Sequence, residues 1–226
     1  MKLSIYAGTL CLGLILLEPL AGSSAGGQSN LVQLRVSMFN SSPLLPSTIE
    51  TAEREAGGVL RSAGVEVVWL NCPQDAQHDA SHGVCSEVSF PAHLHLRILR
   101  ASRGLKATTV GISFTAKDGT GCYADLFYEA IQQLHEETDA SPSLVLGHAM
   151  AHELGHLLLG TNSHSPSGLM RAHWTREDLA NASKGNLRFS QEQSLRITSR
   201  LVRGAPPEPQ TLDMAGTTGV GKFKPE

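Results

Sequence analysis

The chain has 226 residues, of which 41% are hydrophobic and 17% are charged, and its formal net charge is −3 at pH 7. Glycine and proline occur at ordinary levels, so the composition is that of one globular domain long enough to bury a sizeable core. Because the charge is nearly balanced and no Lys/Arg cluster stands out, we expect no nucleic-acid partner.

Residues 1–25 have the pattern of a secretory signal peptide. Lys2 precedes an apolar run from Leu3 to Leu17, and small residues at 23–25 offer a cleavage site near Ala25. The run is short for a membrane span, and an uncleaved anchor is the alternative interpretation. We therefore expect a secreted or periplasmic protein with no stable membrane insertion after cleavage.

Predicted strands and helices indicate a single mixed α/β domain over residues 26–203. Alternating apolar and polar residues predict strands at 31–39, 65–70, 93–99, 108–114 and 122–127. Helical spacing and caps predict helices at 47–63, 128–137, 144–159 and 190–202, with a short helix after Thr175. His93 and His95 share a strand face with Arg97, which predicts a solvated face. Residues 204–226 are rich in Pro, Gly and Thr and are predicted to be disordered.

Three of the four cysteines lie in the expected mature chain. Cys72 and Cys85 lie near the ends of a loop-like stretch, and in an exported protein we expect them to form a disulfide worth about 3 kcal/mol. Cys122 would then be a free, buried thiol. His78 and His82 of the same loop are predicted to be solvated, with a second metal site as the alternative.

Residues His152 to His156 read H-E-L-G-H, which matches the pattern H-E-x-x-H. In a helix, residues four apart lie on one face, so both imidazoles can bind one ion. Zinc prefers four ligands and keeps one position open in catalytic sites. Glu153 follows the first histidine and can contact a metal-bound water without binding the ion, as the general base of a hydrolase does.

The helix predicted around this motif is apolar nearly all round and therefore buried. Leu144 to Leu159 contains no proline, Ser141 or Ser143 can cap its start, and Gly160 can end it. Burying two histidines and a glutamate is costly unless they are paired or bind a metal. This cost favours a metal site over the alternative, a core helix whose histidines are satisfied by hydrogen bonds.

The motif and the residues after it resemble the active site of the metzincin clan of zinc endopeptidases, and within it the matrixins. The family pattern is H-E-x-x-H-x-x-G-x-x-H, followed by a tight turn that carries a methionine beneath the metal. The resemblance implies zinc ligands at His152, His156 and His164, a general base at Glu153, and the turn methionine at Met170.

The spacing departs from the family pattern after the second histidine. Gly160 comes one residue late and His164 two residues late, which one extra helical residue and one extra loop residue would explain. Strict register would instead place Asn162 as the third ligand, but a neutral amide is a poor partner for zinc.

The resemblance also implies a fold and an activity. The fold is a mixed twisted sheet of about five strands with a backing helix, an active-site helix and a C-terminal helix. The activity is that of a secreted zinc endopeptidase, a monomer that hydrolyses protein or peptide substrates through a zinc-bound water. In this family an extended substrate pairs with an edge strand, for which residues 111–114 and 122–126 are candidates.

Two other interpretations keep the metal but change its role or its ligands. In the first, the chain is a non-catalytic exported module with a structural zinc site, closed by His148 as a fourth ligand. In the second, it is a thermolysin-like enzyme whose third ligand is a downstream carboxylate, Glu177 or Asp178.

Overall fold

The computed structural model describes residues 31–77 and 80–204. The predicted signal peptide, the tail beyond residue 204, His78 and the side chain of His82 lie outside the described residues, so those expectations remain predictions. The predicted strands form one five-stranded sheet in the order β2-β1-β3-β5-β4. They are β1 (Val32–Asn40), β2 (Val65–Cys72), β3 (His93–Leu99), β4 (Gly111–Phe114) and β5 (Tyr123–Phe127). All neighbouring strands are parallel except β4, which runs antiparallel to β5 at the edge.

The predicted helices are also present, which confirms the mixed α/β fold class. They are α1 (Pro46–Ser62), α2 (Tyr128–Thr138), α3 (Pro142–Leu159), α4 (Arg176–Ser183) and α5 (Gln191–Gly204). Ser141 caps α3 by accepting a hydrogen bond from the Leu144 N–H. Thr175 caps α4 in a reciprocal box with Asp178, and Ser190 exchanges the corresponding hydrogen bonds with Gln193.

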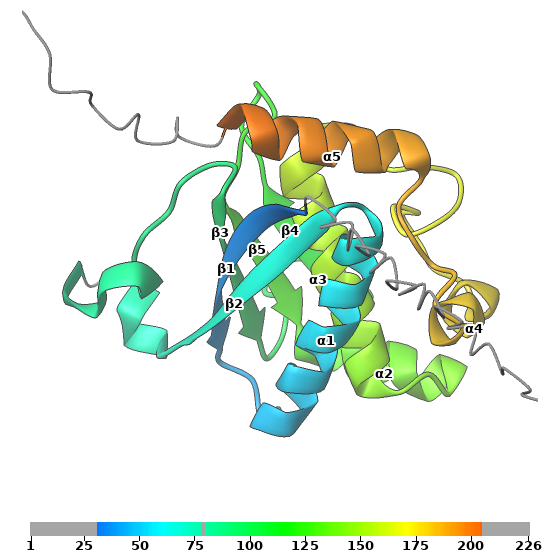
Figure 1. The fold of residues 1–226 in the computed structure, drawn as a ribbon. Helices are drawn as coiled ribbons and strands as arrows, with labels where there is room; N and C mark the ends of the chain where they lie inside the picture. The colour runs from blue at the N-terminus through cyan, green and yellow to red at the C-terminus, as the bar shows by residue number, and fades with distance from the viewer. Residues whose placement is uncertain (1–30, 78–79, 205–226) are drawn as a thin grey trace, which may run out of the picture.

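The helices α1 and α3 cover one face of the sheet, and the main core lies between the sheet and these helices (Figure 1). Alternate residues of β1 and β3 point into this core, among them Leu34, Val36, Leu94 and Leu96. Helix α3 crosses α1 closely at Gly147, where a β-carbon would lie 2.6 Å from the Ala52 carbonyl oxygen. The close crossing buries α3 almost completely and leaves its metal-motif side chains in a largely apolar setting.

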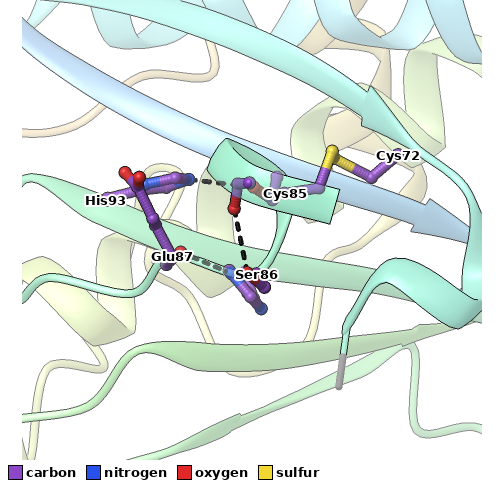
Figure 2. Close-up of a disulfide and its surroundings, with 8 residues drawn as sticks. Cys72, Cys85, Ser86, Glu87 and His93 are labelled. Atoms are coloured by element: carbon purple, nitrogen blue, oxygen red, sulfur yellow. Dashed lines mark hydrogen bonds between the residues drawn. A yellow bond between two sulfur atoms is a disulfide. The ribbon is translucent and has the colours of Figure 1, made fainter. Parts of the chain in front are cut away.

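On the opposite face of the sheet, the prediction that His93 and His95 face solvent is wrong. His93 and His95 are buried, because the segment between β2 and β3 folds over them. His93 Nε2 lies 2.8 Å from Ser37 Oγ, and His95 Nε2 lies 2.8 Å from the Glu87 carbonyl oxygen. Figure 2 shows Glu87 beside His93, with the disulfide farther along the covering segment. A covering loop of this kind carries no periodic pattern, so its position could not be predicted from the strand sequence.

The predicted disulfide joins Cys72 to Cys85, at the end of β2 and in the covering segment (Figure 2). This segment contains two short 3-10 helices, Gln74–Gln77 and Ala80–Cys85. Cys122 is a free, partly buried thiol whose pKa is raised by burial. Within the described residues, no helix combines the length and the apolar character needed to cross a membrane.

Candidate metal centre

Three histidine side chains from α3 and the following loop converge on one point. His152 and His156 lie one helical turn apart, and their Nε2 atoms are 3.0 Å from each other. The Nε2 atom of His164 is 3.1 Å from that of His156. All three ligand atoms lie within 4.8 Å of one another. Tetrahedral zinc, with Zn–N bonds of about 2.0–2.1 Å, would place its nitrogen ligands about 3.3 Å apart, close to the observed separations.

The loop after α3 explains how a histidine eight residues downstream returns to His156. The helix ends at Leu159, and Gly160 has a φ of 85°. Asn162 also has a positive φ, 57°, which is uncommon for a residue with a side chain. These two backbone conformations reverse the chain and bring His164 against His156. Asn162 remains exposed on the turn and does not belong to the cluster.

Hydrogen bonds on the far side of two rings orient them toward the cluster. His152 Nδ1 donates to the Leu169 carbonyl oxygen at 2.8 Å, and the Trp174 indole N–H donates to the same oxygen at 3.0 Å. A neutral His152 protonated at Nδ1 has its lone pair on Nε2. His156 Nδ1 lies 2.6 Å from the hydroxyl of the buried Ser163. Both rings are therefore held with Nε2 toward the cluster.

The electrostatic environment keeps these rings neutral. Burial, the largest cause, lowers the pKa of His152 to about 4. Burial, followed by the neighbouring His152, lowers the pKa of His156 to about 3. Neutral imidazoles are the form that binds metal ions. Three imidazole nitrogens that converge within 4.8 Å of one another are donors that zinc prefers, so the residues fit a metal ion.

Glu153 lies beside the cluster but does not belong to it. Its side chain is 6% exposed, and its Oε2 lies 2.7 Å from Ser113 Oγ in β4. Burial raises the pKa of Glu153 to about 7, while the hydrogen bond from Ser113 opposes that shift. The backbone of Gly111 approaches so closely that a β-carbon there would lie 2.7 Å from Glu153 Cγ. The carboxyl group is thus enclosed between α3 and the edge strand.

The histidine cluster and Glu153 open into a cleft of about 730 Å³. One wall is β4 with the segment before it, and another is the face of α2 that contains Ala130 and Leu134. The segment Arg171–Trp174 also lines the cleft. A cleft of this volume, with a few polar groups converging in it, is typical of a site that binds a ligand.

The other predicted ligands lie elsewhere. His148 is buried one turn before His152, and its Nδ1 bonds the Leu144 carbonyl oxygen, so it does not close the site as a fourth ligand. The Asp178 carboxylate caps α4 and pairs with Arg171 at 3.0 Å. Glu177 is exposed in the first turn of α4. Within the part of the chain that the structure describes, no cysteine, carboxylate or further histidine joins the three histidines.

Met170 is fully buried directly beneath the motif helix. A β-carbon at Gly155 would stand 2.7 Å from its sulfur. The turn before Met170 is closed by a hydrogen bond from the Ser165 N–H to the Met170 carbonyl, and Gly168 has a φ of 77° within it.

Sequence reasoning missed the supporting residues of the site. Ser113, Ser163 and Trp174 contact Glu153, His156 and the Leu169 carbonyl, respectively. A single serine in a strand or a loop carries no spacing signal. A single tryptophan such as Trp174 likewise carries no spacing signal.

No family model matches the sequence, and no curated protein matches it. The solved structures with a similar fold include the following two. One is a zinc-dependent peptidase from Methanocorpusculum labreanum, with 14% identity and a TM-score of 0.47 over 72% of this chain and 99% of that one. The other is an archaemetzincin from Methanopyrus kandleri, with 16% identity and a TM-score of 0.45 over 79% of this chain and 99% of that one. Neither likeness is strong enough to identify the function of this chain.

Proposed function

We propose that the chain is an exported zinc-dependent endopeptidase. In this proposal His152, His156 and His164 bind the zinc ion, and Glu153 is the general base. The observation that carries the proposal is the convergence of three imidazoles beside a buried carboxyl group in an open cleft.

The donor set supports a catalytic zinc rather than a structural one. Structural zinc sites are closed by four protein ligands, whereas catalytic sites have three and leave one position open. The described residues supply three histidines and no fourth protein ligand. Zinc bound there would polarise a carbonyl group and lower the pKa of a water molecule to near 7.

The properties of Glu153 match those of a general base in peptide hydrolysis. It is buried beside the three histidines without belonging to the cluster, and a carboxylate in that place can accept and release a proton. In the proposed reaction Glu153 accepts a proton from the attacking water and delivers it to the leaving amine. Met170 supports the ligand helix from below without binding the metal.

The edge strand β4 gives the site a place for an extended peptide. The sequence offered two candidates for the edge strand, residues 111–114 and 122–126. In the sheet, β4 is the edge strand and β5 lies inside. The Val110 carbonyl accepts from the Phe127 N–H, so by alternation the N–H and C=O groups of Gly111 and Ser113 lie at the free edge. A protein or peptide substrate can add to this edge as a further strand.

Export is part of the proposal and has its own support. The disulfide between Cys72 and Cys85 suits an oxidising compartment, and residues 1–25 have the pattern of a signal peptide. Mass spectrometry of the protein recovered outside the cytoplasm should give a chain that begins after residue 25. A chain that still begins at Met1 would contradict cleavage.

Metal analysis combined with a cleavage assay tests the function. The mature chain should bind a single zinc ion and cleave an unfolded protein such as reduced casein. A chelator should abolish cleavage, and added zinc should restore it. A zinc-loaded chain that leaves unfolded proteins and extended peptides of varied sequence intact would overturn the proposal.

A further inference from the structure

Ser113 in β4 contacts Glu153 twice, although the two residues lie in different elements. Its Oγ is 2.7 Å from the carboxylate Oε2 and 2.8 Å from the backbone carbonyl oxygen of Glu153. Within residues 31–77 and 80–204, no other side chain makes a hydrogen bond to this carboxyl group. A buried carboxylate needs a hydrogen-bond donor. The Ser113 hydroxyl supplies that donor and so restrains the position of the Glu153 carboxyl group.

The main chain of Ser113 points away from β5, while its side chain points to α3. As the pairing of β4 shows, the N–H and C=O groups of Ser113 lie at the free edge of the sheet. One residue therefore has its backbone where an extended substrate would pair and its hydroxyl on the general base. Ser113 would therefore connect a strand-paired peptide directly to Glu153.

Gly111 completes the enclosure on the same strand. A β-carbon at this position would lie 2.7 Å from Cγ and from Oε1 of Glu153. The carboxyl group thus lies against bare backbone at Gly111 and is held by a hydroxyl at Ser113. Both constraints come from the strand that lines the cleft, and neither involves the histidine cluster.

We propose that Ser113 is a positioning residue for the peptidase reaction. It holds one carboxylate oxygen of Glu153 against the substrate-binding strand and so fixes the base relative to the scissile bond. The inference rests on the proposed peptidase function and adds a residue that neither the motif nor the metal site identifies.

Three variants of the zinc-loaded protein test this role. Ser113→Ala removes the hydroxyl and should lower kcat by about 10- to 100-fold, the cost of misplacing a reacting group, while KM changes less than about threefold. Ser113→Thr keeps the hydroxyl and should restore most of kcat. Ser62→Ala is the matched control, because it removes a serine hydroxyl that bonds the Val59 carbonyl in α1, and it should retain wild-type activity.

Two measurements that do not depend on activity accompany the kinetics. The visible absorption spectrum of the cobalt-substituted Ser113→Ala protein should match that of the wild type, because the ligands are untouched. In the zinc-free chain, the effects of Ser113→Ala and Glu153→Leu, which each remove one partner of the hydrogen bond, on the unfolding equilibrium should be non-additive by at least about twofold, as for residues in contact. If Ser113→Ala does not fold, Ser113→Cys, a weak donor of similar volume, takes its place.

The outcomes separate this inference from the proposed function. A zinc-loaded wild type that cleaves no peptide overturns the peptidase function, and this role with it. An active wild type with an equally active Ser113→Ala overturns only the role of Ser113. Equal losses in Ser113→Ala and Ser113→Thr, additive unfolding effects or an altered cobalt spectrum would also contradict positioning by the hydroxyl.

Discussion

The sulfur of Met170 lies so close to the backbone of Gly155 that no side chain fits between them. A β-carbon at Gly155 would stand 2.7 Å from Met170 Sδ and 2.7 Å from a ring carbon of Phe189. Gly155 directly precedes His156, so this contact packs the turn of α3 that contains the ligand His156 against Met170 and Phe189.

Replacing Gly155 by alanine should therefore destabilise the protein despite the better helix propensity of alanine. Overpacking costs about 1–3 kcal/mol and outweighs a propensity gain of about 1 kcal/mol. The matched control is Gly58→Ala in α1, where an added β-carbon meets nothing within 4 Å and should stabilise by about 0.5–1 kcal/mol. Urea unfolding of the zinc-free chains measures the free energy of unfolding of both variants. Equal stability of the two variants would contradict the close packing of Met170 against Gly155.

The identity of the third ligand can be tested with two histidines. His164→Ala should lose most of its zinc affinity, because it leaves two protein ligands. His148→Leu should retain zinc, since its ring bonds the Leu144 carbonyl outside the cluster. Competition with a zinc-binding dye reports both affinities. Full zinc binding by the His164→Ala variant would point to another third ligand. Zinc loss in a folded His148→Leu variant would support the structural zinc site with His148 as the fourth ligand.

Ser163 should affect zinc affinity without contacting the metal. Its hydroxyl orients His156 through Nδ1, and loss of such an outer partner typically costs 10- to 100-fold in affinity or activity. We expect a loss in this range for Ser163→Ala and none for Ser167→Ala, an exposed serine in the same loop. The same dye competition measures both, and equal affinities would show that the ring needs no such support.

The sequence was sufficient for the features that rest on local patterns. The helix of α3, its Ser141 cap, the one-turn spacing of His152 and His156 and the five strands all follow from short-range periodicity. These patterns depend on residues within a few positions of each other, so they can be read without tertiary contacts.

Features that depend on distant contacts could not be predicted. The resemblance grouped His164 with the other two histidines, but the path of the loop that brings it there, with positive φ at Gly160 and Asn162, does not follow from a residue count. The antiparallel position of β4 at the sheet edge depends on pairing with β5. The burial of His93 and His95 depends on a loop that folds over them, and alternation along β3 gives no sign of it.

The disulfide should stabilise the fold without affecting the metal. Joining Cys72 to Cys85 closes a loop with a sequence separation of 13, for which the chain-entropy model gives about 3 kcal/mol. The loop covers the sheet face opposite α3, as Figure 1 shows. The double replacement by serine should therefore lower the free energy of unfolding and leave zinc affinity unchanged. Denaturant unfolding measures the loss of stability, and zinc titration measures the affinity. A large loss of zinc affinity in the folded variant would contradict the prediction that the disulfide does not affect the metal site.

The most direct test of the central claim is the peptidase activity of Glu153→Gln at equal zinc content. Glutamine keeps the shape and a hydrogen-bonding oxygen for Ser113 but cannot accept the proton from water. General bases contribute about 10²- to 10⁴-fold, so the variant should bind zinc, fold with little change in Tm, and lose at least about 100-fold in kcat. A Glu153→Gln variant that cleaves as fast as the wild type would show that the activity does not depend on this base, and the assignment of the site as a peptidase centre would be wrong.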